Sequence, residues 1–157
     1  MNTISNRALI SRLYKSAEDH LKEVNIDAQN WTSLYTAVQD LTVPEKMVFI
    51  VVKLNQKVTH GGLSEFYHSP YGMFAPEIIH VFNEIKALAS ADIIASSLNV
   101  VNPIELLDPS FKAFIFNIKL TDHQRSQLFQ LDIRYDNLQD IENLEDLLGN
   151  YLQTLVG

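Results

Sequence analysis

The segment between residues 54 and 77 constrains the fold more than any other part of the chain. It holds three of the five glycines and two of the five prolines. Gly61 and Gly62 are adjacent, and glycine readily adopts the positive φ angles at which helices end. Gly72 supplies a second break, and Pro76 fits the first turn of a new helix, where its missing N–H costs nothing. These signals predict two core helices that meet at a fixed angle through a glycine pair and a turn.

Four aromatic residues surround the second break, namely Phe66, Tyr67, Tyr71 and Phe74. The usual role of such a cluster is to seal the junction between two helices, and we favour this interpretation. The alternative is that the rings line a ligand pocket. A tyrosine hydroxyl could also reach the surface as an interaction group.

Apolar residues recur at three- and four-residue steps along most of the chain, which is typical of amphipathic helices. Ser5, Asn30, Thr42 and Thr121 precede such stretches and are favourable N-cap residues, and Glu45 completes a capping box with Thr42. We therefore expect an all-α protein of about seven to nine helices. The expected helices cover residues 5–24, 30–41, 42–60, 76–88, 90–102, 121–135 and 138–155, and residues 111–120 fit either a helix or a short buried strand.

The bulk composition predicts a single domain, residues 1–157, with a sizeable core. No cysteine is present, so neither a disulfide nor a thiolate metal site contributes to the fold. The longest apolar run, Met47 to Val52, is far shorter than a membrane span, and we expect it at the centre of the core. The N-terminal residues lack the apolar core of a signal peptide. We expect a cytoplasmic protein that does not contact a membrane.

Negative charge is concentrated near the C-terminus. The net charge is −7, and residues 120–157 contain seven acidic and two basic residues. This balance argues against direct binding of nucleic acid. If one helix continues through them, Asp132, Asp136 and Asp140 follow at intervals of four residues and form a row of carboxylates. A solvated helix face explains such a row most simply, and a surface that binds a basic protein is the alternative.

Motifs for metal binding and catalysis are weak. Glu77 and His80 have the spacing of half a di-iron ligand set, with Glu84 one turn further on, but a second copy of the motif is missing. The sequence has no Gly-x-Ser-x-Gly elbow and no phosphate-binding glycine loop. We therefore expect no metal, no cofactor and no enzymatic activity. An enzyme would need a concave pocket with perturbed ionisable groups, for which the candidates are His60, Glu65, Tyr67 and Tyr71.

Two motifs carry a resemblance to a known family. The first consists of Asn55, Gly61, Gly62, Leu63, Glu65, Phe66, Tyr67, Ser69, Gly72, Ala75, Pro76 and Glu77. The second is the run from Leu131 to Tyr135, followed by Leu144, Leu147, Leu148, Tyr151 and Leu152. Over roughly residues 46–155 the chain resembles the bacterial DNA-mimic protein 19 family. His60, Leu63 and Glu65 stand where the family pattern usually has Asn, Phe and Gln, so the chain resembles a divergent member.

The resemblance implies a non-catalytic interaction domain whose acidic face occupies the DNA-binding site of a basic protein, such as a transcription regulator. The alternative is an immunity or antitoxin-type protein that inhibits a toxic enzyme. A homodimer through the apolar stripe of the last helix is also conceivable, although the stripe would pack equally well inside the monomer. The acidic face would comprise Asp132, Asp136, Asp140, Glu142, Glu145 and Asp146. A structural or interaction role would fall to the motif residues Gly61, Gly62, Glu65, Phe66, Tyr67, Gly72, Pro76 and Glu77.

Overall fold

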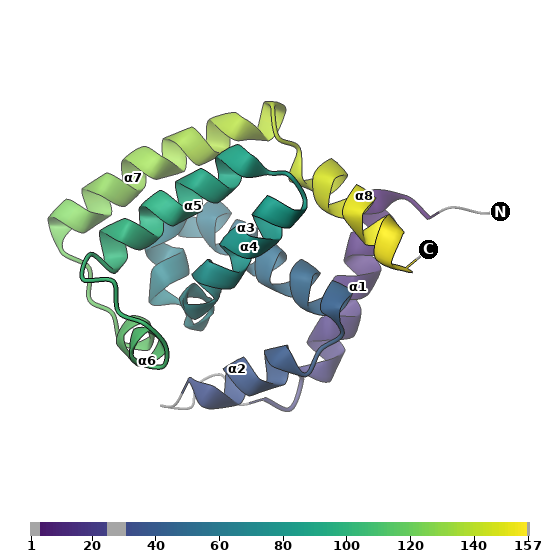
Figure 1. Ribbon diagram of the computed structural model, residues 1–157, viewed down its shortest axis with the longest axis horizontal. Helices are drawn as coiled ribbons and strands as arrows, with labels where there is room; N and C mark the ends of the chain where they lie inside the picture. Colours follow the sequence, from purple (N-terminus) through teal and green to yellow (C-terminus); the bar gives the residue numbers. More distant parts are fainter. Residues whose placement is uncertain (1–3, 25–30, 157) are drawn as a thin grey trace.

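The computed structural model describes residues 4–24 and 31–156, and within these ranges the chain forms helices and no β-strand (Figure 1). The predicted all-α class and the number of helices are therefore confirmed. The α-helices are α1 (Asn6–His20), α2 (Thr32–Gln39), α3 (Val43–His68), α4 (Ala75–Glu84), α5 (Leu88–Val101), α6 (Ser110–Phe116), α7 (Asp122–Asn137) and α8 (Leu144–Val156), and the 3₁₀ helices are η1 (Pro70–Phe74) and η2 (Leu138–Asp140).

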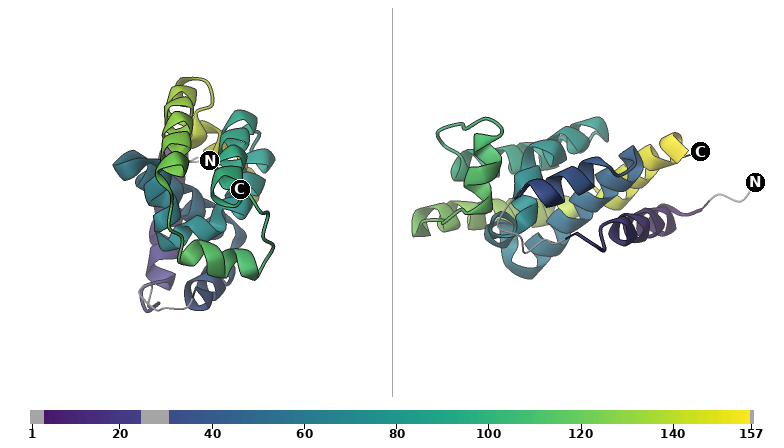
Figure 2. Two further views of the ribbon diagram at one scale, coloured as in Figure 1. Left: turned by 90° about the vertical axis from the view of Figure 1, so that its left-hand side faces the viewer. Right: turned by 90° about the horizontal axis from the view of Figure 1, so that it is seen from below.

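Helix α3 lies at the centre of the molecule and contacts α1, α4, α6, α7, α8 and η1 (Figure 1). Its residues from Met47 to Val51 are all buried, as expected for a segment that is apolar around nearly its whole circumference. Around it, α7 packs on α5 (Figure 2, left) and α8 packs on α1 (Figure 2, right). None of the helices in the described ranges is long and apolar enough to cross a membrane.

Three of the predicted N-caps are confirmed. Ser5 and Thr121 accept hydrogen bonds from the first turns of α1 and α7, and Thr42 forms a capping box with Glu45 at the start of α3. Burial by itself would raise the pKa of Glu45, but hydrogen bonds from Ser16 and Thr42 outweigh it, and the pKa is lowered. The predicted cap Asn30 lies outside the described residues.

The glycine pair divides α3 into two parts. Gly61 has φ −152° and ψ 19°, and Gly62 has φ 79° and ψ −176°, so both residues leave the helical region. The second part begins at Leu63, whose N–H donates a hydrogen bond of 2.8 Å to Oδ1 of Asp132 on α7. Gly62 passes so close to this carboxylate that a Cβ atom would lie 3.0 Å from Cγ of Asp132. The kink therefore depends both on the positive φ of Gly62 and on its missing side chain.

The last helix begins later than predicted. Its expected start, Leu138, lies in η2, and Ile141 is 81% exposed instead of continuing the apolar stripe. The physical reason is Glu142, whose carboxylate turns toward the start of α5. It accepts hydrogen bonds from the N–H groups of Ala89 (2.8 Å) and Ser90 (2.9 Å) and from the Ser90 hydroxyl (2.8 Å). Helix α8 then starts at Leu144, with the Asn143 side chain accepting a hydrogen bond from the N–H of Asp146.

Smaller differences concern other helix boundaries. Helix α1 ends at His20, earlier than the expected Val24, and α5 begins at Leu88, two residues before the expected start. Lys86 adopts a positive φ of 69° in the short link between α4 and α5. Of the two alternatives for residues 111–120, the helix is correct, because α6 spans Ser110–Phe116.

The apolar stripe of α8 packs inside the chain. Leu144, Leu148 and Leu152 are buried, and α8 lies against α1. Gly149 approaches Asn6 so closely that a Cβ atom would overlap the Asn6 side chain. The stripe that could have formed a homodimer is therefore used within the monomer.

Replacing Gly62 by alanine tests the kink. We expect Gly62→Ala to destabilise the protein by at least about 2 kcal/mol, because Gly62 occupies a backbone region that is open almost only to glycine and a Cβ would overlap Asp132. Gly61→Ala is the matched control. It should change the free energy of unfolding by less than about 1 kcal/mol, because φ at Gly61 is negative and the atoms nearest to an added Cβ belong to the flexible Glu65 side chain. Urea unfolding of both variants measures the difference, and equal losses would contradict this explanation.

Replacing Glu142 by alanine tests the cap of α5. At neutral pH the loss should be about 1 to 2 kcal/mol, because two N–H groups at the start of α5 lose their acceptor. Burial tends to raise the pKa of Glu142, but its hydrogen bonds lower it below the ordinary value of 4.5. The stabilisation is therefore complete above that value and disappears as the pH falls through the lowered pKa.

The measurement for this second prediction is urea unfolding of the wild type and Glu142→Ala at neutral and at acid pH. The difference between the two proteins should shrink in acid. Glu145→Ala is the control, because Glu145 is exposed and makes only a surface ion pair with Arg7. A similar loss in both variants, or a difference that does not depend on pH, would rule out the capping role.

Candidate functional site

The six acidic residues predicted to form one face lie on the segment from the second half of α7 through η2 to the first turn of α8 (Figure 1, green to yellow). The predicted row along one continuous helix is interrupted, because α7 ends at Asn137 and Asp140 lies in η2. Asp132 and Asp136 remain one turn apart on the same helix. The six residues are therefore neighbours in the fold, but they differ in what their carboxylates contact.

Two of the six carboxylates bind backbone N–H groups. Asp132 is half-buried and accepts the hydrogen bond from Leu63, and burial raises its pKa because it outweighs that bond. Glu142 caps α5 and has a lowered pKa. Both side chains thus connect the C-terminal part of the chain to distant helices. Glu142 uses both carboxylate oxygens, whereas Asp132 uses Oδ1 and stays half-exposed.

The other four carboxylates are exposed. Asp136, Asp140 and Asp146 form no ion pair within the described ranges, and Glu145 meets Arg7 at 3.4 Å between two largely exposed side chains. Such a surface pair contributes little binding energy and can exchange for another partner. These four residues, Asp136, Asp140, Glu145 and Asp146, are called the acidic junction below.

The fold brings two further acidic residues toward the acidic junction. Glu84 at the end of α4 accepts a hydrogen bond of 2.9 Å from the hydroxyl of Tyr151 on α8. Asp92 is exposed on α5, two residues after the Ser90 that Glu142 binds. Neither residue was predicted, because nothing in a single sequence indicates that the end of α4 meets Tyr151 of α8 or that the start of α5 meets Glu142.

The aromatic residues of the motif are buried. Phe66, Tyr67 and Phe74 have no exposed surface, and the rings of Phe66 and Tyr67 pack edge to face with centroids 5.0 Å apart. The Tyr67 hydroxyl lies 2.6 Å from that of Ser97, and burial raises the pKa of Tyr67. Gly72 is also buried, because the chain passes so close to Tyr67 that a Cβ would lie 3.0 Å from its Cα. The cluster seals a helix junction, the interpretation favoured from the sequence.

The polar members of the motif lie at the surface or near it. Glu65 pairs with His60 at 2.7 Å, and Glu77 pairs with Lys46 at 2.9 Å. Pro76 is exposed in the first turn of α4. The enzyme alternative would require His60 and Glu65 to converge with Tyr67 in one pocket. They do not, because Tyr67 is buried while the other two lie at or near the surface.

In the described ranges no group of three or more histidine, aspartate or glutamate side chains is placed to hold a metal ion. In the suspected half of a di-iron site, His80 lies 3.2 Å from Glu84. Glu77 instead forms an ion pair with Lys46 and accepts a hydrogen bond from Gln39.

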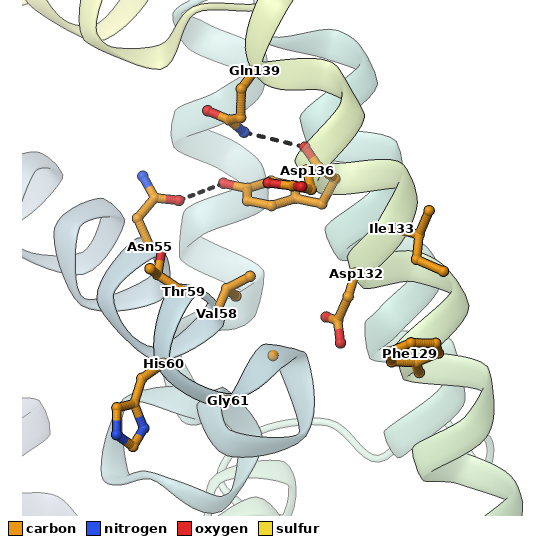
Figure 3. Close-up of a pocket in the computed structure, with 12 residues that line it drawn as sticks. Asn55, Val58, Thr59, His60, Gly61, Phe129, Asp132, Ile133, Asp136 and Gln139 are labelled. Atoms are coloured by element: carbon orange, nitrogen blue, oxygen red, sulfur yellow. Dashed lines mark hydrogen bonds between the residues drawn. The ribbon is translucent and has the colours of Figure 1, made fainter.

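A groove with a volume of about 670 Å³ lies between parts of α3 and α7 (Figure 3). One wall is the end of the first part of α3 together with the glycine pair, and the other is α7, from which Asp132 points toward the kink. The hydroxyl of Tyr135 closes one end by donating a hydrogen bond of 2.8 Å to Oδ1 of Asn55. The groove is lined by Asn55, Val58, Thr59, His60, Gly61, Gly62, Phe129, Asp132, Ile133, Tyr135, Asp136 and Gln139.

Comparison with known proteins identifies one family. The chain matches no curated protein and no solved structure. The family model described as DMP19-like protein matches residues 39–155, which include the whole of α3, the glycine pair, the acidic junction and most of α8. The match covers well over half of the chain. The chain therefore belongs to the DMP19-like protein family, the DNA-mimic protein 19 family that its two motifs resemble.

Proposed function

We propose that this protein is a non-catalytic interaction domain that acts as a DNA mimic. Its acidic junction occupies the DNA-binding site of a basic protein, such as a transcription regulator. Membership of the DMP19-like protein family supports this function. The observation that carries it is the exposure of four carboxylates on one segment whose backbone is held at Asp132 and Glu142, each of which binds N–H groups of a distant helix.

The physical basis is electrostatic. A DNA-binding protein binds phosphates with lysine and arginine side chains, and much of its affinity comes from the release of condensed ions. A fixed group of carboxylates presents comparable negative charges to the same side chains. The net charge of −7 is modest, but the charge is concentrated in the C-terminal quarter, where it produces a stronger local potential.

In this proposal the predicted residues divide into two roles. Asp136, Asp140, Glu145 and Asp146 are placed to contact the partner, and Glu84 and Asp92 extend the negative surface. Asp132 and Glu142 position this surface by capping helices. A backbone that is already fixed favours binding, because every group that binding must immobilise lowers the affinity.

The proposal predicts that removing exposed charge at the acidic junction weakens binding. The partner is first isolated from native cytosol on the immobilised protein and identified. The triple variant Asp136→Asn, Asp140→Asn, Asp146→Asn should then weaken its binding at least tenfold, and duplex DNA and added salt should both displace the partner.

The matched control is the triple variant Asp19→Asn, Glu23→Gln, Asp40→Asn. It removes the same charge from exposed positions on α1, on the turn that follows it and at the end of α2. It should change the affinity by less than about twofold, because charges beyond about 10 Å are largely screened at physiological salt. Equal weakening by the two variants, or binding that neither salt nor duplex DNA affects, would refute DNA mimicry and favour the antitoxin-type alternative.

A further inference from the structure

The groove between α3 and α7 exposes apolar side chains that have no partner within the described part of the chain. Phe129 is 59% exposed and Ile133 is 45% exposed, and the two lie one turn apart on α7 (Figure 3). They are not part of the face with which α7 packs on the core, because that face consists of Leu128, Leu131 and Tyr135. Covering the exposed parts of these two side chains would favour association, because it removes apolar surface from water.

The same wall of the groove carries two carboxylates. Asp132 and Asp136 are also one turn apart, so acidic and apolar side chains alternate along this side of α7. Asp132 uses Oδ1 for the N–H of Leu63, and Asp136 has no bonded partner in the described ranges.

No lysine or arginine occurs among the described residues that line the groove. His60 is the single basic side chain there; it pairs with Glu65 at 2.7 Å and points away from α7 (Figure 3). The groove is therefore negatively charged, and no described lysine or arginine pairs with its carboxylates.

We propose that this groove binds a basic amphipathic helix of the partner protein. Apolar side chains of that helix pack on Phe129 and Ile133, and arginines one turn apart pair with Asp132 and Asp136. The spacing supports a helix, because side chains three or four residues apart on it match the one-turn spacing on α7. An arginine can also stack on the exposed ring of Phe129.

This inference rests on the proposed function and adds a second component to it. The carboxylates of the acidic junction imitate phosphates, so their contacts with the partner weaken as salt increases. Contacts in the groove are partly apolar, so they persist at high salt and distinguish this partner from other basic proteins.

The test uses a defined probe. A fluorescent, lactam-bridged helical peptide carries arginines at positions i and i+4 and leucines at i+3 and i+7. One matched peptide has citrulline in place of each arginine, which keeps the shape and removes the charge, and another has serine in place of each leucine. Fluorescence anisotropy gives the affinity, and amide chemical shifts of the ¹⁵N-labelled protein locate the site.

We expect the arginine–leucine peptide to bind, with the largest shifts at Asn55, Thr59, Gly62 and Asp136. Phe129→Ser and Asp136→Asn should each weaken it at least fivefold, as should either change in the peptide. The control variants Leu107→Ser and Asp19→Asn change exposed residues outside the groove and should leave the affinity unchanged. The double variant Asp140→Asn, Asp146→Asn should also have little effect on the peptide affinity, because these residues lie outside the groove.

Four outcomes would overturn the inference: no binding up to about 1 mM peptide, equal binding of the citrulline peptide, shifts centred on η2 and α8, or insensitivity to Phe129→Ser. A sedimentation change caused by Phe129→Ser alone would instead assign the groove to a second copy of the chain. The proposed function is judged separately. If the peptide binds the groove but duplex DNA does not displace the isolated partner, DNA mimicry fails while the groove assignment stands. If duplex DNA displaces the partner but the peptide does not bind the groove, only the groove assignment is rejected.

Discussion

Carboxylates that cap the starts of distant helices hold the C-terminal part of this chain against its central helix. The first N–H groups of a helix have no partner within the helix, and burying them without an acceptor is costly. Asp132 supplies an acceptor for the second part of α3, and Glu142 supplies one for α5. The interruption at η2 and the late start of α8 accompany the Glu142 contact, and the Asp132 contact adds to the packing of Leu128, Leu131 and Tyr135 that positions α7.

The same contacts connect stability with the proposed binding surface. Asp132 lies in the groove, and Glu142 lies between Asp140 and Glu145, so residues that hold the fold are adjacent to residues that are free to bind. Because the backbone is fixed at these points, a partner does not need to order the backbone of this segment when it binds, only the exposed side chains. The acidic junction and the groove together would give a partner both electrostatic attraction and a shape-specific contact.

Several features of the fold could be predicted because they depend on neighbours in the sequence. The capping box of Thr42 and Glu45 joins residues three positions apart, and the apolar run after it is buried as its composition requires. Gly62 has the positive φ that the glycine pair suggested. The family resemblance also came from local motifs, and the family match over residues 39–155 confirms it.

The sequence alone thus determined the helical class, most helix starts and the concentration of negative charge, since each is set by the order of side chains along a short stretch. The tertiary structure alone decided which acidic side chains cap helices and which remain exposed. Glu142 meets Ser90 across 52 positions and Asp132 meets Leu63 across 69, and no local pattern specifies such pairs. Nor could periodicity show that Phe129 and Ile133 face a groove, because only the packing of α7 on α3 and α5 determines which of its faces is covered.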